Sequence, residues 1–169
     1  QLPNCWEFLV LCLACARIGA AANPVMPIFR QHELTFMLDF GESKVFIVPK
    51  VFRGFDHEAM ARSMLHDLPH LTNLVVIGGE GEDSFESRLL GDDTPALSGP
   101  GIGPDDVLLL MYTSGTTGEP KGVMHTSNTL FSNLHAYRET MELGPDDIIL
   151  GASPMAHLTC AGHTRDDIR

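Results

Sequence analysis

The sequence feature that most constrains this chain is a polar run, residues 112–122, that directly follows an apolar run, residues 107–111. The apolar residues Val107-Leu108-Leu109-Leu110-Met111 are typical of a buried β-strand. The polar run predicts a tight loop at the carboxyl end of that strand. In open α/β sheets, this is the end of a strand at which ligands bind.

The residues of this loop suit a polyphosphate ligand. Glycine lets main-chain N–H groups approach a ligand closely, and N–H groups that turn inward form an anion-binding concavity. The glycines are Gly115, Gly118 and Gly122, and the hydroxyl donors are Thr113, Ser114, Thr116 and Thr117. Lys121 adds a mobile positive charge. The alternative is a solvated hairpin loop rich in turn-forming residues.

A P-loop of the nucleotide triphosphatases does not fit the run. That pattern is G-x-x-x-x-G-K-[ST], and only Gly115 and Lys121 match its spacing. Pro120 stands where the second glycine belongs and has no N–H to offer a phosphate. Gly122 stands where a magnesium-binding Ser or Thr belongs.

The run instead resembles the phosphate-binding signature of the adenylate-forming enzymes, [YF]-T-S-G-[ST]-T-G-x-P-K-G. Tyr112 to Gly122 matches this pattern without departure. Two other segments are similar to the family: the opening, with Leu2-Pro3-Asn4 and Ala21-Ala22-Asn23-Pro24, and the later Ser153-Pro154-Met155-Ala156-His157. The resemblance covers residues 1–158, as a partial AMP-binding N-terminal domain, and is greatest to acyl-CoA synthetases for medium-chain, cyclic or related carboxylic acids.

The resemblance implies a two-step reaction. ATP activates a carboxylic acid as an acyl-adenylate, and coenzyme A then takes the acyl group as a thioester. The implied phosphate-binding residues are Thr113, Ser114, Gly115, Thr116, Thr117, Gly118 and Lys121. Lys121 would stabilise the departing pyrophosphate, and otherwise is a solvated loop lysine. His157 would line the substrate pocket, and otherwise is a histidine hydrogen-bonded to backbone.

Several family elements have no counterpart here, among them the adenine and magnesium motif, the hinge and the C-terminal catalytic lysine. We therefore expect an N-terminal fragment that carries no complete catalytic set, is inactive alone and holds few of the Mg²⁺ ligands. The start at Gln1 and the atypical polar residues 159–169 favour the same interpretation. A peptide-synthetase adenylation domain, a luciferase-like enzyme and a non-catalytic nucleotide-binding module remain alternatives.

Charge and cysteine content limit the other function classes. The net charge of −11 argues against nucleic acid as a partner, since such binding depends on basic patches. Cys12 and Cys15 form a lone C-x-x-C in an apolar helical pattern, so we expect small buried core residues and no metal site. The simplest inference from the cysteines is a reduced, cytoplasmic protein. We expect no transmembrane segment, because Glu7 and Arg17 interrupt the apolar stretch Trp6–Ala22.

Strand and helix patterns alternate along the chain and predict an α/β fold with a mainly parallel sheet and flanking helices. Strands are predicted at 20–23, 44–48, 74–77, 107–111, 122–125 and 148–152. Helices are predicted at 6–19 (buried), 31–40, from 57 to just before Pro69, at 84–90, and after an N-cap at Thr126 or Ser127. The acidic, Gly- and Pro-rich residues 80–106 predict a break between two subdomains.

Overall fold

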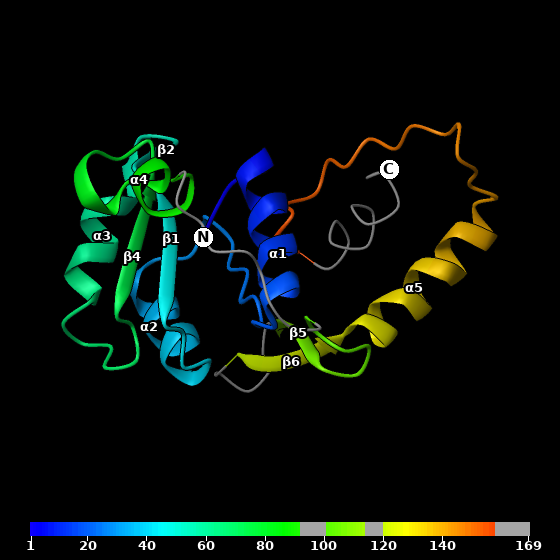
Figure 1. The fold of residues 1–169 in the computed structure, drawn as a ribbon, viewed down its shortest axis with the longest axis horizontal. Helices are drawn as coiled ribbons and strands as arrows, with labels where there is room; N and C mark the ends of the chain where they lie inside the picture. The colour runs from blue at the N-terminus through cyan, green and yellow to red at the C-terminus, as the bar shows by residue number, and fades with distance from the viewer. Residues whose placement is uncertain (92–100, 114–119, 158–169) are drawn as a thin grey trace. The chain divides into compact units, whose positions relative to one another are not determined.

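A computed structural model of the chain describes residues 1–91, 101–113 and 120–157. The chain divides into two compact units. Unit 1 comprises Gln1–Pro3, Val25–Ser98 and Ser114–Pro120, and unit 2 comprises Asn4–Pro24, Gly99–Thr113 and Lys121–Arg169. Both units combine strands with helices (Figure 1), so the predicted α/β class is confirmed. The described strands pair both in parallel and in antiparallel fashion.

Unit 1 is built on two parallel strands, β1 (Val45–Pro49) and β4 (Asn73–Ile77), which pair in register from Val45↔Asn73 to Pro49↔Ile77. Both are runs of β-branched and large apolar residues, which suit a pleated, buried surface. Phe46, Val48 and the centre of β4 are at most 3% exposed. These predicted strands are confirmed.

The helices of unit 1 supply the rest of its core. They are α2 (Gln31–Phe40), α3 (His57–Met64) and α4 (Phe85–Leu89), with a 3₁₀ turn η1 (Gly81–Asp83) before α4. The apolar stripe of α2 is buried as its spacing predicts, at Leu34, Met37 and Leu38. In Figure 1, α3 lies alongside the β1–β4 pair. Helix α3 begins where expected but ends several residues before Pro69.

One small hairpin in unit 1 was not predicted. Strands β2 (Val51–Phe52) and β3 (Phe55–Asp56) are antiparallel, and Arg53 and Gly54 connect them. Both connecting residues have positive φ, 51° and 76°. A two-residue loop of that kind matches the right-handed twist of the flanking strands. Such short strands leave no periodic pattern in the sequence.

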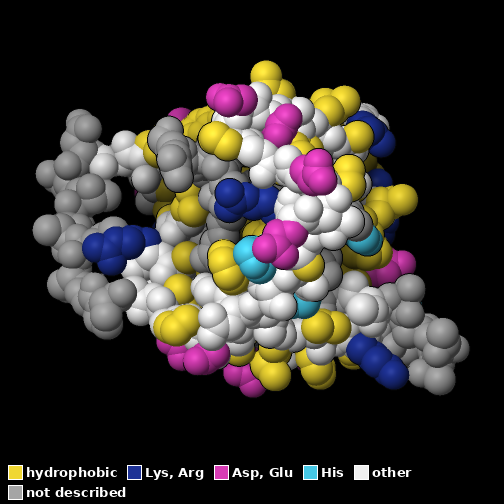
Figure 2. Space-filling model, turned by 90° about the vertical axis from the view of Figure 1, so that its right-hand side faces the viewer, with side chains coloured by type: hydrophobic (Ala, Val, Ile, Leu, Met, Phe, Trp, Pro, Cys, Tyr) yellow, Lys and Arg dark blue, Asp and Glu magenta, His cyan; other side chains and the backbone are white. Residues whose placement is uncertain are grey.

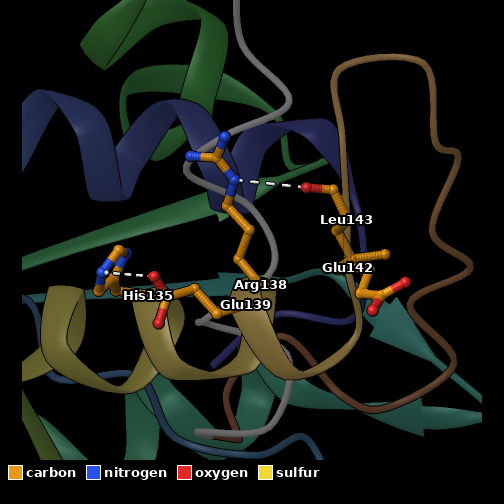
Figure 3. Close-up of a pocket in the computed structure, with 5 residues that line it drawn as sticks. All are labelled: His135, Arg138, Glu139, Glu142 and Leu143. Atoms are coloured by element: carbon orange, nitrogen blue, oxygen red, sulfur yellow. Dashed lines mark hydrogen bonds and ion pairs between the residues drawn. The ribbon is translucent and has the colours of Figure 1, made fainter.

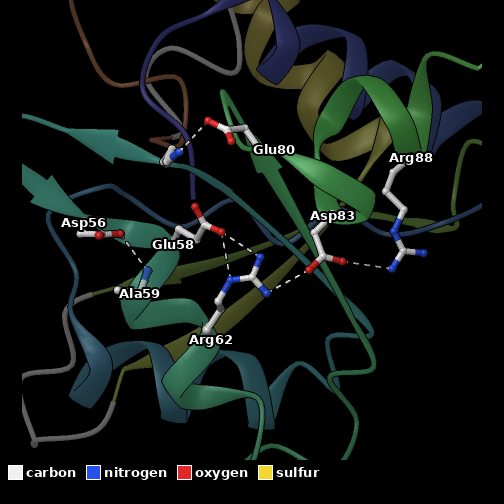
Figure 4. Close-up of polar contacts among 8 residues, drawn as sticks. Asp56, Glu58, Ala59, Arg62, Glu80, Asp83 and Arg88 are labelled. Atoms are coloured by element: carbon white, nitrogen blue, oxygen red, sulfur yellow. Dashed lines mark hydrogen bonds and ion pairs between the residues drawn. The ribbon is translucent and has the colours of Figure 1, made fainter.

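Exposed ion pairs link α3 to the segment that contains η1 and α4 (Figure 4). Arg62 on α3 binds Glu58 at 2.8 Å and Asp83 at 2.9 Å, and Arg88 approaches Asp83 at 3.4 Å. The hydrogen bond that Asp83 accepts from Arg62 is the main cause of the lowered pKa of Asp83. Because these side chains are partly or largely in solvent, the pairs fix geometry more than they add stability.

Unit 2 is organised around an antiparallel pair, β5 (Val107–Thr113) and β6 (Lys121–Thr126). On the other side of β5, Ala22 pairs in parallel through two backbone hydrogen bonds. The Ala22 N–H donates to the Leu108 carbonyl, and the Ala22 carbonyl accepts from the Leu110 N–H. Both strand predictions are confirmed, and the predicted strand at 20–23 is reduced to this bridge. The core of the unit consists of Leu108, Leu109, Met111 and Leu130, with Ala16, Ala22 and Ile102 packed against it.

Helix α1 (Trp6–Ile18) forms as predicted but is not buried. It ends at Gly19, whose φ of 75° is the left-handed conformation that favours glycine. None of its residues is buried, and Trp6 and Ile18 are 57% and 61% exposed. The expectation of a buried helix, with buried Cys12 and Cys15, is therefore wrong: an apolar helix is buried only where other elements cover it, and Cys12 and Cys15 are only partly covered.

Apolar side chains are exposed elsewhere too, as yellow groups on the face drawn in Figure 2 show. Helix α5 (Ser127–Thr140) begins at Thr126, whose side chain accepts a hydrogen bond from the Thr129 N–H, as the predicted N-cap requires. Leu130 alone among the residues of α5 is buried. The strand expected at 148–152 is wrong, since no described residue pairs with it and Ile148 is 98% exposed. Among the described helices, none has the length and apolar character needed to span a membrane.

Unit 1 contains a buried histidine. His57, the first residue of α3, is fully buried, and its Nδ1 lies 3.0 Å from Gln1 Oε1. The Phe55 ring meets the imidazole edge-on at 4.9 Å between centroids. Nε2 is buried and has no hydrogen-bond partner among the described residues. Burial, followed by the positive charges of Arg30 and of the Gln1 amino group, lowers the pKa of His57.

This environment makes the stability of the chain depend on pH. The lowered pKa makes His57 harder to protonate in the folded chain than in the unfolded chain, where its ordinary pKa is about 6.5. The unfolded state therefore binds more protons in acid. We expect the free energy of unfolding to be flat above about pH 7 and to fall below about pH 6.5, by at most about 1.4 kcal/mol per pH unit. Urea unfolding from about pH 5 to pH 8 measures this slope, and His57→Gln should make it shallower. Equal slopes in both proteins would contradict the assignment.

Candidate functional site

The structure describes the two edges of the predicted phosphate loop. Thr113 is the last residue of β5, and Lys121 is the first residue of β6. Five of the predicted phosphate-binding residues, Ser114, Gly115, Thr116, Thr117 and Gly118, lie outside the described residues. The site can therefore be built from the strands that carry the loop and from the segments that contact those strands.

The loop connects two antiparallel strands. The β5–β6 register runs from Val107↔Thr126 to Thr113↔Lys121, with an irregularity between Val107 and Leu109. Residues 114–120 thus make up the whole connection, which is longer than the loops of about two to five residues that are common in hairpins. An ordinary hairpin has no need of such a connection, and this length favours a loop with a binding role.

The register places Thr113 and Lys121, the two described residues of the predicted phosphate-binding set, directly opposite each other. Thr113 and Lys121 form the last cross-strand pair, and both are exposed. No ion pair or hydrogen bond links the Lys121 ammonium to another residue in the described part of the chain. A hydroxyl and a lysine, both groups that can bind an anion, therefore stand at the two ends of the connection.

Tyr112, the first residue of the motif, is held by a residue from far away in the sequence. Asn23 Nδ2 donates a hydrogen bond of 3.5 Å to the Tyr112 hydroxyl. Burial raises the pKa of Tyr112, and the hydrogen bond from Asn23 opposes the rise. Because Ala22 is hydrogen-bonded to β5, Asn23 is fixed beside the strand and can orient the phenol. No local pattern in the sequence links Asn23 to Tyr112, so this contact could not be predicted.

The predicted substrate-pocket residue lies on a separate segment. His157 is exposed, and its N–H donates a hydrogen bond of 2.9 Å to the Pro154 carbonyl, which closes a turn over residues 154–157. Asn4 holds the start of this turn: its Nδ2 donates to the Ser153 carbonyl at 2.9 Å, and its Oδ1 accepts from the Met155 N–H at 2.8 Å. Nothing local in the sequence links residue 4 to residue 153, so the contact could not be predicted.

The structure thus brings Thr113 and Lys121 together by strand pairing and places His157 in a turn of the same unit. A shallow depression at the end of α5 is a separate feature (Figure 3). It is lined by His135, Arg138, Glu139, Glu142 and Leu143. Arg138 Nε donates to the Leu143 carbonyl at 3.4 Å, and His135 Nε2 lies 3.3 Å from Glu139. None of the predicted site residues lines it.

Comparison with known proteins places these features in a family. The family model described as AMP-binding enzyme matches residues 1–164. A salicylyl-CoA synthase / salicylate adenylyltransferase of a Streptomyces species is 36% identical over 173 residues. That alignment covers 96% of this chain and 31% of the relative, so the chain spans about a third of its length.

Solved structures show the same fold. A long-chain-fatty-acid-CoA ligase from Archaeoglobus fulgidus superposes with a TM-score of 0.76 at 28% identity, over 95% of this chain and 31% of that one. ATP-bound MatB from Rhodopseudomonas palustris superposes with a TM-score of 0.73 at 26% identity, over 96% of this chain and 31% of that one.

The hairpin that carries the loop should depend on its buried face. Met111 on β5 is 7% exposed and belongs to the core of unit 2, whereas Met124 on β6 is 68% exposed. We expect Met111→Ala to lower the free energy of unfolding by about 2–3 kcal/mol through lost burial and a cavity. The matched change Met124→Ala should cost no more than about 0.5 kcal/mol. Chemical denaturation of both variants measures the difference, and equal losses would show that the hairpin is not anchored through β5.

Proposed function

This chain belongs to the AMP-binding enzyme family, and we propose that the protein containing it activates a carboxylic acid with ATP and transfers the acyl group to coenzyme A. The family comprises AMP-forming ligases, and the relatives named above act on aromatic or fatty acids according to their names. The acid that this protein takes, and the CoA step, are part of the proposal.

One observation carries the proposal. The complete signature Tyr112–Gly122 spans a long hairpin connection whose described edges hold Thr113 and an exposed Lys121 side by side. A loop rich in glycine and hydroxyl groups, with a lysine at its mouth, suits the β- and γ-phosphates of ATP. The residues proposed to hold them are Thr113, Ser114, Gly115, Thr116, Thr117, Gly118 and Lys121.

The first step is a substitution at phosphorus. A carboxylate oxygen of the acid attacks the α-phosphorus of ATP, and the bond from that phosphorus to the bridging oxygen breaks, so pyrophosphate leaves. No proton moves. The protein's task is to position ATP and to compensate the charge that builds up on the leaving group. Lys121 is exposed and has no ion-pair partner in the described chain, so its ammonium is available to the pyrophosphate.

In the second step the sulfur of coenzyme A attacks the acyl carbonyl carbon, the bond to AMP breaks and the thiol proton is lost to solvent. We propose that His157, exposed on its turn, borders the acid at this centre. Mg²⁺ would supply further charge compensation to the phosphates. The described residues contain no group of three or more His, Cys, Asp or Glu side chains that could hold the ion.

A second candidate stops after the first step. The Streptomyces relative is named as an adenylyltransferase as well as a CoA synthase, so an adenylate passed to another acceptor, as in a peptide-synthetase domain, is the main alternative. A luciferase-like enzyme shares that first step. A non-catalytic nucleotide-binding module would keep the loop and lack the chemistry.

Two further predictions stay predictions. One is the extent of the family domain, residues 1–158 with a break within 80–106, and the other is a cytoplasmic location.

The proposal is tested on the complete gene product that carries this sequence. We expect exchange of radiolabelled pyrophosphate into ATP that depends on an added carboxylic acid, and AMP release with coenzyme A. Lys121→Ala should lower kcat/KM for ATP by about tenfold to a hundredfold, because a charge-assisted contact to the leaving group is lost. Absence of acid-dependent exchange across aromatic and fatty acids would overturn the proposal.

Lys44→Ala is the matched control, since Lys44 is also exposed but precedes β1 in unit 1. It should leave kcat/KM for ATP unchanged. Exchange without AMP release on addition of coenzyme A would favour the adenylation-only alternative. ATP binding that Lys121→Ala weakens, in a protein without exchange, would favour the non-catalytic module.

A further inference from the structure

The contact between Asn4 and the turn that carries His157 has the form of a peptide–peptide pairing. The carboxamide of Asn4 donates through Nδ2 to the Ser153 carbonyl at 2.9 Å and accepts through Oδ1 from the Met155 N–H at 2.8 Å. Both bonds have good length. They join residues that are 149 and 151 positions apart in the sequence.

This geometry is specific to a primary amide side chain. A carboxylate can accept from Met155 but repels the Ser153 carbonyl, and an alanine can do neither. The N-cap of helix α1 is Cys5, so Asn4 does not occupy the capping position of that helix. Pro154 lies between the two bonded positions and has no N–H of its own, so Asn4 satisfies the donor and the acceptor on either side of it.

Two further features stabilise the same turn. Ala156 is 7% exposed, and the His157 N–H is bonded to the Pro154 carbonyl at 2.9 Å. The preceding residues, by contrast, are exposed and in no strand, with Leu150 90% exposed. Asn4 therefore fixes the turn at the point where the chain passes from an unsupported segment into residues 153–157.

We propose that Asn4 is a positioning residue whose carboxamide clamps the Ser153–Met155 backbone and thereby sets the place of His157 at the acid-binding site. The inference rests on the proposed function for the role of His157, and on the two hydrogen bonds for the clamp itself. Asn4 touches neither the acid nor ATP in this account. Its loss should loosen acid binding while ATP binding by the hairpin persists.

The clamp is tested first by amide hydrogen exchange, followed by NMR on this chain. In Asn4→Ala, the Met155 N–H should exchange about fivefold faster than in the parent chain, as loss of one ordinary hydrogen bond predicts. Asn128→Ala is the matched control, because Asn128 also makes an exposed side-chain bond in unit 2, to Asp105 at 2.6 Å. It should leave Met155 unchanged. Unchanged exchange in Asn4→Ala overturns the clamp.

The positioning role is tested by pyrophosphate exchange in the complete gene product. Asn4→Ala should raise KM for the carboxylic acid about fivefold or more and leave KM for ATP within about twofold, and Asn128→Ala should change neither. Faster Met155 exchange with unchanged kinetics would overturn the role of Asn4 while the proposed function stands. Absence of activity in the parent protein would identify failure of the proposed function instead, and the positioning role would fall with it.

Discussion

The pairing of β5 with β6 is the interaction on which the account of this protein depends. Backbone hydrogen bonds fix the two strands from Val107↔Thr126 to Thr113↔Lys121, and residues 114–120 of the motif connect the last pair. The buried residues of β5, together with Leu130 of α5, hold the hairpin in place. Ala22 bonds to the other edge of β5 and brings Asn23 to Tyr112. A loop that must present amides and hydroxyls to a ligand needs such a rigid base.

Charge explains why the hairpin suits an anion although the chain carries a net charge of −11. What matters is the local field, and the strand register puts the Lys121 ammonium opposite Thr113 at the mouth of the loop. In unit 1, Arg62 and Arg88 instead pair with carboxylates. Among the described ion pairs none involves Lys121.

The elements that could be predicted from sequence are those whose signal is local. The strands around Val48, Val75 and Leu109 and the helix over Gln31–Phe40 follow from apolar patterning, and Thr126 was identifiable as an N-cap. Burial could not be predicted in the same way. Helix α1 is apolar on all sides, but its exposure depends on which partners are present, and pattern alone does not show them. The apolar segment at Ile148 failed as a strand for the same reason, because a strand exists only with a partner.

The candidate site likewise has a part that could be predicted from local sequence and a part that could not. The motif Tyr112–Gly122 identified the loop and its chemistry, whereas the contacts that support it join residues far apart in sequence, as Asn23 does with Tyr112 and Asn4 with Met155. Neither asparagine carries a local pattern that points to its partner.

The central claim, that this hairpin grips the phosphates of ATP, is tested most directly by titrating the chain with ATP and with inorganic pyrophosphate while backbone amide shifts are followed by NMR. The account predicts saturable shifts concentrated at residues 112–122, and the same residues responding to both ligands. Shifts confined to other segments, or none at millimolar ligand, would contradict it.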